Sequence, residues 1–402
     1  MADFNLTASM RDGKLYISLS GRVASQNVAE LETRLTAERK NHPNGSVVFD
    51  CEGLVYISSA GLRVLLTFNK KENAPIKIIN VSPEAYEIFD ITGFTEIFEV
   101  SKKLRDISNA AVRKMGTAGS ITVYYIGDDT LLKVYPYGTK LETIEHERQF
   151  AQVAMLLEIP TLIAYDIVTF NGHYGMLYEL AKANTVFSVL ENEPVKLNFY
   201  ATEMGKLLRQ IHKADPQLDI IPKARENYIA LADEMGNWLH PQEVKILKDI
   251  ICSIPDTDNL LYNNFSARNV FVQQNGELIL INMLGITSGN PIYDLGKIYM
   301  FYRNNDAEMT KRLTGFESFQ AQKLWLAMML GYFNTTNLAV VNQLEEKFEA
   351  AASLISAVYP ASYRKTNGVD LSIDDIEFFV SRARRDVFPS TYRIQNVLSS
   401  KD

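Results

Sequence analysis

Two neighbouring serines, Ser58 and Ser59, stand where an apolar strand gives way to a helix. The apolar run 47–49 precedes them, and Leu62 and Leu65 follow at helical spacing. A serine at a helix start caps free backbone N–H groups with its hydroxyl, and the positive pole of the helix dipole there tolerates a phosphate. A phosphate brings nearly two negative charges and can switch a docking surface off. The pair therefore predicts either a phosphorylation site or an unmodified N-cap, and spacing alone favours the unmodified cap.

A second set of residues could hold phosphate groups. Gly116 and Gly119 lie in a turn before a strand, and glycines let a backbone approach phosphates closely. Lys133 lies on the next strand and Glu147 on the helix after it, which is similar to the kinase arrangement in which such a pair holds phosphates. Glu179 ends a later hairpin strand at an expected hinge and completes the predicted nucleotide-binding set. The alternative is a structural ion pair between Lys133 and Glu147.

The overall composition is that of an ordinary globular protein. The 402 residues are 47% hydrophobic and 22% charged, with a net charge of -7, and are enough for two or more domains. The negative charge argues against nucleic acid or an anionic membrane as a partner. Neither a membrane span nor a secretory signal is predicted. Cys51 and Cys252 are expected to be buried thiols of a cytoplasmic protein, and no metal site is predicted.

The elements that position the two serines follow from short periodic segments. The turn signal Arg11-Asp12-Gly13 joins two alternating runs into a hairpin. An amphipathic helix is expected over 27–40, a strand over 76–81, and a helix over 83–89 that Gly93 ends. This order predicts an α/β domain with a mixed sheet and packed helices.

Residues 1–106 resemble a STAS domain, the family of anti-sigma factor antagonists. The matching segments are 15–23, 27–32, 50–66, 78–83 and 89–94. In that family a partner kinase phosphorylates the helix-start serine followed by a small residue, glycine and leucine, which implies Ser59, with Ser58 as the second choice. Ser58 stands where the family often has aspartate. The resemblance implies a protein partner of the anti-sigma factor or serine kinase type.

Residues 116 to about 340 resemble the aminoglycoside phosphotransferase and choline-kinase-like family. Segment 259–270 matches its catalytic block, His-Gly-Asp followed after four residues by Asn, and segment 278–296 matches its metal block, Ile-Asp with Gly-Asp-Pro and Tyr-Asp-Leu. The resemblance implies a bilobal protein-kinase-like fold after a linker at 107–115. Its N-lobe is expected over 116–182 and its helical C-lobe over 183–402.

The departures from this family concern the residues that do the chemistry. Asn264 stands at the catalytic aspartate position and Asn282 at the metal-binding aspartate position, while Asn269 is retained. An amide cannot accept the acceptor's proton, and loss of a general base costs roughly 10²–10⁴-fold in rate. Mg²⁺ prefers an anionic oxygen, and Ile121 replaces a further glycine. We therefore expect a pseudokinase that binds ATP with weak or no Mg²⁺, if it binds ATP at all; as turn residues, Asn264 and Asn282 would only satisfy backbone groups.

Two functions follow from these interpretations. The first is a regulatory signalling protein, in which a STAS module switched at Ser59 is fused to an inactive kinase-like scaffold or nucleotide sensor. The alternative is an active phosphotransferase that acts on a small hydroxylated substrate. Near the C-terminus, Arg382, Arg384 and Arg385 are expected to form a solvated basic face on a helix that begins at Ser372.

Overall fold

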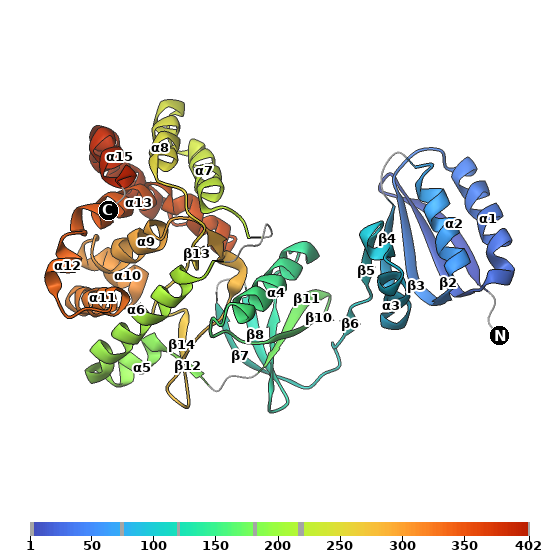
Figure 1. The fold of residues 1–402 in the computed structure, drawn as a ribbon, viewed down its shortest axis with the longest axis horizontal. Helices are drawn as coiled ribbons and strands as arrows, with labels where there is room; N and C mark the ends of the chain where they lie inside the picture. The colour runs from blue at the N-terminus through green and yellow to red at the C-terminus, as the bar shows by residue number, and fades with distance from the viewer. Residues whose placement is uncertain (1–3, 73–75, 119–120, 180–182, 216–220, 401–402) are drawn as a thin grey trace. The chain divides into compact units, whose positions relative to one another are not determined.

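The computed structural model of the protein describes residues 4–72, 76–118, 121–179, 183–215 and 221–400. Two units, Met1–Asp106 and Ile107–Asp402, each have their own internal contacts (Figure 1). Within the described ranges, no helix combines the length and the apolar character needed to cross a bilayer.

The first unit is built on a mixed sheet. Asp12 and Gly13 both have positive φ angles, 47° and 73°, and form the tight turn of the predicted hairpin. The strands lie in the order β1-β2-β3-β4-β5, and only the β1–β2 pair is antiparallel. The strands are β1 (Asn5–Arg11), β2 (Lys14–Val23), β3 (Val47–Ile57), β4 (Lys77–Val81) and β5 (Glu99–Lys102), with the two-residue strand β6 (Arg105–Asp106) at the end of the unit.

Helices cover this sheet and close its core. The helices are α1 (Val28–Asn41), α2 (Ser59–Asn69) and α3 (Pro83–Ile91), and α1 lies beside α2 (Figure 1). A Cβ atom on Gly61 would lie 2.7 Å from Val23 and 2.8 Å from Ile57. The glycine after the two serines is therefore needed for the close packing of α2 on the strands. The predicted mixed sheet with packed helices is confirmed.

The second unit begins with an antiparallel sheet. Its strands include the run β10-β11-β9-β8-β7, and one sheet face packs an apolar cluster that contains Leu132, Val168 and Leu177. Figure 1 shows α4 lying across this sheet. The bounds are β7 (Val112–Ala118), β8 (Ile121–Ile126), β9 (Thr130–Val134), α4 (Leu141–Leu156), β10 (Ala164–Phe170) and β11 (His173–Glu179). Residues 107–115, expected to be a linker, contain the first residues of β7.

The rest of the second unit is mainly helical, which confirms the predicted kinase-like fold with a helical C-terminal lobe. Short strands interrupt it among the described residues: β12 (Ala183–Thr185), β13 (Leu260–Leu261), β14 (Val270–Gln273), β15 (Leu278–Leu280) and β16 (Thr287–Ser288). The helices are α5 (Val186–Asn192), α6 (Leu197–Lys213), α7 (Ala224–Glu234), α8 (Pro241–Ser253), α9 (Ile292–Tyr302), α10 (Ala307–Thr314), α11 (Ser318–Phe333), α12 (Leu338–Asn342), α13 (Glu345–Asn367), α14 (Ile373–Arg382) and α15 (Thr391–Ser399).

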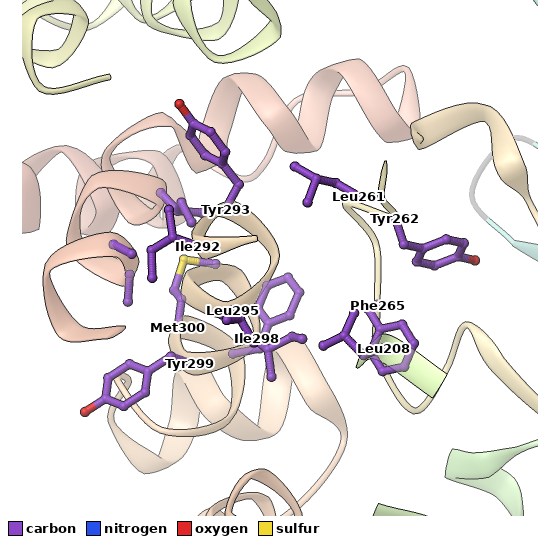
Figure 2. Packing of buried hydrophobic residues seen from close by; sticks show 14 of the residues in the cluster. Leu208, Leu261, Tyr262, Phe265, Ile292, Tyr293, Leu295, Ile298, Tyr299 and Met300 are labelled. Carbon is purple, nitrogen blue, oxygen red and sulfur yellow. The ribbon is translucent and has the colours of Figure 1, made fainter. Parts of the chain in front are cut away.

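The core of this lobe depends on close helix contacts. A Cβ atom on Gly205 of α6 would lie 2.0 Å from the carbonyl oxygen of Met328 in α11, and one on Gly331 would lie 2.2 Å from the carbonyl oxygen of Thr202. The two backbones therefore touch where they cross. Figure 2 shows the adjoining cluster, in which Phe265 lies beside Leu208.

The basic run near the C-terminus differs from its predicted exposure. Ser372 does cap the helix, accepting a hydrogen bond from the backbone N–H of Asp375. The expectation that all three arginines face solvent is wrong for Arg382, which is 9% exposed. The reason is that α14 continues into a π-helical turn, η6 (Ala383–Val387), and the end of α14 packs against α13.

Candidate functional site

Lys133 lies in the middle strand of the second unit's sheet. Strand β9 pairs with β8 and β11, and Lys133 lies opposite Val123 and Met176. Alternation along the strand places Lys133 and Tyr135 on the same face. Lys133 is only 9% exposed, so its ammonium group needs partners within the protein.

Glu147 of α4 supplies that partner and is itself fully buried. Its carboxylate accepts hydrogen bonds from Lys133 Nζ at 2.5 Å, from the Tyr135 hydroxyl at 2.7 Å and from the Tyr178 hydroxyl at 2.9 Å. Burial and the nearby Glu147 charge raise the pKa of Tyr178 well above its ordinary value, so this hydroxyl stays a donor. The structure thus brings the predicted pair together and adds two tyrosines to it.

Asn282 approaches the same lysine from another segment. Lys133 Nζ lies 3.4 Å from Asn282 Oδ1, because α4 packs against the short helix η5 (Met283–Gly285) that follows Asn282. Asn282 has a φ angle of 75°, a left-handed conformation that asparagine tolerates better than most residues. Lys133 therefore contacts both Glu147 and the amide that replaces the family's metal-binding carboxylate.

The loop that carries Asn264 is hydrogen-bonded through its backbone to a buried aspartate. Asp294, near the start of α9, accepts hydrogen bonds from the backbone N–H groups of Tyr262 at 2.8 Å and Asn263 at 2.7 Å. His212 Nε2 lies 3.1 Å from the same carboxylate, and its Nδ1 lies 2.8 Å from the Tyr332 hydroxyl. These contacts fix the loop backbone immediately before Asn264.

Side chains of the loop also stabilise its shape. Asn269 Nδ2 donates to the carbonyl oxygen of Asn264 at 2.8 Å, and the Tyr262 hydroxyl donates to the carbonyl oxygen of Ile281 at 2.6 Å. Asn263 stands where the resembling family has glycine and has a φ angle of 62°. Asn269 and Asn263 thus stabilise the backbone conformation of the turn. The Tyr262 hydroxyl connects the loop to the residue before Asn282.

Lys297, which no sequence motif indicated, contacts the backbone of this loop. Lys297 Nζ donates to the carbonyl oxygen of Asn263 at 2.8 Å. Burial lowers the pKa of Lys297 to about 8, and the charge of Asp294 partly opposes this shift. The folded chain therefore releases the Lys297 proton at a lower pH than the unfolded chain does.

This depressed pKa predicts a pH-dependent contribution to stability. Between pH of about 8 and the ordinary lysine pKa of 10.5, the unfolded chain binds a proton at Lys297 that the folded chain lacks, so stability rises with pH. We expect the free energy of unfolding of wild type, relative to Lys297→Met, to increase from pH 8 to pH 10. Urea unfolding at several pH values measures this difference, with the exposed Lys245→Met as the control. Parallel curves for wild type and Lys297→Met would contradict it.

The remaining predicted nucleotide-binding residues have varied surroundings. Gly116 lies within β7, and Gly119 lies outside the described residues. Glu179, at the end of β11, accepts a hydrogen bond from the backbone N–H of Ile163 at 3.0 Å. Its carboxylate therefore holds the segment before β10, and no contact of its side chain with Lys133 occurs among the described residues.

In the first unit, the two serines differ sharply in their surroundings. Ser58 is the N-cap of α2, its hydroxyl accepts a hydrogen bond from the backbone N–H of Gly61 at 3.2 Å, and it is 7% exposed. Ser59 is the first residue of the helix and is exposed. A modifying enzyme can therefore approach the Ser59 hydroxyl, whereas the Ser58 hydroxyl is buried and occupied.

The second unit does not fit a divalent cation at the expected positions. Asn264 and Asn282 are neutral, and the ammonium of Lys133 lies beside the Asn282 oxygen that would be a ligand. In the part of the chain that the structure describes, no three histidine, cysteine, aspartate or glutamate side chains gather as a potential metal site. Lys133, paired with Glu147, is the cation that lies beside Asn282.

Sequence reasoning missed Tyr135, Tyr178 and Lys297. A signal existed for Tyr135, because it stands two residues after Lys133 and so shares its strand face. Tyr178 could have been found only with the pairing of β9 and β11. The position of Lys297 under the loop depends on how α9 packs, which no local pattern reveals.

Comparisons with known proteins agree with the two units. Residues 5–107 match the STAS domain family, and residues 117–321 match the family described as "Phosphotransferase enzyme family". A Bordetella bronchiseptica protein described as "Putative anti-sigma factor antagonist BtrV" is 37% identical over 111 residues, which cover 27% of this chain and 94% of that protein.

Solved structures to which the chain is similar include the following two. An aminoglycoside phosphotransferase, APH(4)-Ia, in the apo form of a thermostable mutant, has a TM-score of 0.47 at 15% identity and covers 69% of this chain and 93% of its own. The ethanolamine kinase of Plasmodium vivax has a TM-score of 0.47 at 12% identity, covering 90% of this chain and 95% of its own.

Proposed function

The chain belongs to the phosphotransferase enzyme family through residues 117–321 and carries a STAS domain over residues 5–107, and from this premise we propose that it is a cytoplasmic regulatory protein controlled at Ser59. The STAS domain and its similarity to an anti-sigma factor antagonist support a regulatory role through protein partners. The partner proposed is an anti-sigma factor or a serine kinase. The kinase-like domain is proposed to act as a scaffold or nucleotide sensor.

The observation that carries the proposal is the contrast between the two serines. Ser59 is exposed at the first position of α2, while Ser58 is buried and caps the helix. A phosphate on Ser59 would sit at the positive end of the helix dipole, which favours negative charge. It would leave the fold of α2 intact and change the charge of the surface that a partner contacts.

Ser59→Asp is expected to abolish or greatly weaken partner binding while the STAS domain stays folded. The measurement is capture of the partner by the full chain from cells that make it naturally, combined with intact-mass analysis of Ser59 phosphorylation. Ser46→Asp is the matched control, because Ser46 is also exposed and lies at the opposite end of β3. Unchanged capture by Ser59→Asp, or no phosphate on Ser59 under any growth condition, would contradict the switch.

The proposed role of the kinase-like domain rests on Lys133. Its ammonium lies 2.5 Å from the Glu147 carboxylate and 3.4 Å from Asn282 Oδ1. A phosphate group beside Asn282, where the resembling family has a metal-binding aspartate, would contact this ammonium. ATP would then be bound through the strand lysine, with Mg²⁺ contributing little.

Calorimetric titration with ATP is expected to give the same Kd, within about twofold, in excess Mg²⁺ and in EDTA. Lys133→Met should weaken binding at least about tenfold, because a buried charge-assisted contact to phosphate is lost. Lys245→Met, an exposed change on α8, is the control. Tight binding that requires Mg²⁺ would instead favour the second candidate function.

That second candidate is an active phosphotransferase acting on a small hydroxylated substrate. The assembled pair of Lys133 and Glu147 favours it. The amides at 264 and 282 oppose it, because neither can act as a general base.

A further inference from the structure

A cavity of about 280 Å³ lies in the helical lobe of the second unit, away from the loop of Asn264, and three arginines line it. Arg382 is the buried one, with a side chain that is 10% exposed. Its two terminal nitrogens donate to Asn305 Oδ1 and to the carbonyl oxygen of Asn304. Among the described residues its buried Nε has no hydrogen-bond partner, and the nearest carboxylate, Asp386, lies 3.7 Å away. Arg382 is thus a fixed guanidinium that retains an unused donor.

The backbone beside the cavity is unusual in a way that points to function. Residues 383–387 form the π-helical turn η6 between α14 and the short helix η7 (Phe388–Ser390). Such turns are rare and occur often at functional sites. The turn places Arg385 and Asp386 on the cavity wall, whereas Arg384, between Ala383 and Arg385, pairs with Glu243 of α8.

The other two arginines are exposed and are paired with carboxylates. Arg385 is 73% exposed and donates two hydrogen bonds to the Asp386 carboxylate, from Nε at 2.8 Å and from a terminal nitrogen at 2.9 Å. Arg393 of α15 is 61% exposed, lies 2.9 Å from Glu346 and lies 3.7 Å from Glu349. Exposed ion pairs are open to solvent and mostly contribute little to stability, so a phosphate group can compete with the carboxylates for these two arginines.

Glu349 and neutral polar residues complete the lining. The side chains of Ser353 and Ser390 and the residue Asn304 lie on the cavity wall with the arginines. Guanidinium groups match the oxygens of a phosphate in geometry and charge. Serine hydroxyls suit the hydroxyl groups of a ligand.

We propose that this cavity binds a small phosphate monoester of the sugar-phosphate or polyol-phosphate class. Arg382 forms the fixed base of the site, and Arg385 and Arg393 turn from their carboxylate partners onto the phosphate. Two of those partners, Asp386 and Glu349, themselves line the cavity. The volume of about 280 Å³ leaves room for the organic part of the ligand beside the serines. The site shares no residue with the proposed nucleotide contact at Lys133.

The test is calorimetric titration of the full chain with glucose 6-phosphate and with glycerol 3-phosphate. At least one is expected to bind saturably, and glucose and inorganic sulfate are expected to bind at least about tenfold more weakly. The double variant Arg385→Gln, Arg393→Gln should lose at least about tenfold in affinity. Both arginines are exposed, so the variant is expected to fold, and its thermal unfolding checks this.

Two controls separate this site from other anion contacts. Arg384→Gln removes a neighbouring arginine that does not line the cavity and should leave affinity unchanged. Lys133→Met should also leave it unchanged, whereas it weakens ATP binding if the nucleotide proposal holds. Absence of binding by both phosphate esters, equal binding of sulfate, or equal loss of affinity in Arg384→Gln or Lys133→Met would overturn the proposal.

Discussion

A variant that carries both Asn264→Asp and Asn282→Asp is expected to release ADP from Mg²⁺-ATP at least about 10²-fold faster than wild type. The first change restores a group that can accept a proton from the acceptor hydroxyl or from water. The second restores an anionic oxygen that Mg²⁺ prefers. Both replacements have nearly the same size and shape as asparagine, so packing is preserved.

We expect this increase in rate because the residues that would position the two carboxylates are already in contact with the loop and with residue 282. The backbone before Asn264 is held by Asp294, and Asn269 holds the carbonyl of Asn264 from within the loop. Lys133 lies 3.4 Å from Asn282 Oδ1 and would pair with a carboxylate there. These contacts would position the two restored carboxylates in the variant.

The measurement is ADP release, together with intact-mass analysis for phosphate on the chain itself. Each single Asp variant is expected to remain near wild type, because the base and the metal ligand act as a unit. Asn237→Asp, an exposed change in the same unit, controls for added charge. If wild type already turns over ATP as fast as the double variant, the proposal that the domain is inactive is wrong.

Glu147→Ala is expected to lower the free energy of unfolding of the second unit by about 3–5 kcal/mol. The change leaves the buried ammonium of Lys133 without its counter-charge. It also removes the acceptor for the hydroxyls of Tyr135 and Tyr178, which are both buried. Unpaired buried donors add to the cost of the missing ion pair.

Urea unfolding followed by tryptophan fluorescence measures this loss in the second unit alone. Both tryptophans of the chain, Trp238 and Trp325, lie in that unit. Glu142→Ala, an exposed change in the first turn of the same helix, is the matched control and should cost less than about 1 kcal/mol. A Glu147→Ala loss as small as that of the control would show that the buried pair does not stabilise the sheet and helix.

The sequence by itself determined the features that depend on neighbouring residues. The hairpin at Asp12 and Gly13, the helix start at Ser58 and Ser59, and the cap at Ser372 follow from turn chemistry and local periodicity. The two domain families could likewise be recognised from the sequence, because their motifs are continuous segments. Each of these features depends on contacts between residues that are close in sequence, so a local sequence pattern is enough to predict it.

Only the tertiary structure decided which side chains share one environment. Glu147 of α4 bonds to Tyr135, which follows β9, and to Tyr178 of β11. Asp294 of α9 bonds both to the loop and to His212. Arg382 was expected at the surface but is buried against the residues after α9. Each of these contacts joins residues distant in sequence through the packing of several elements, and local spacing holds no information about that packing.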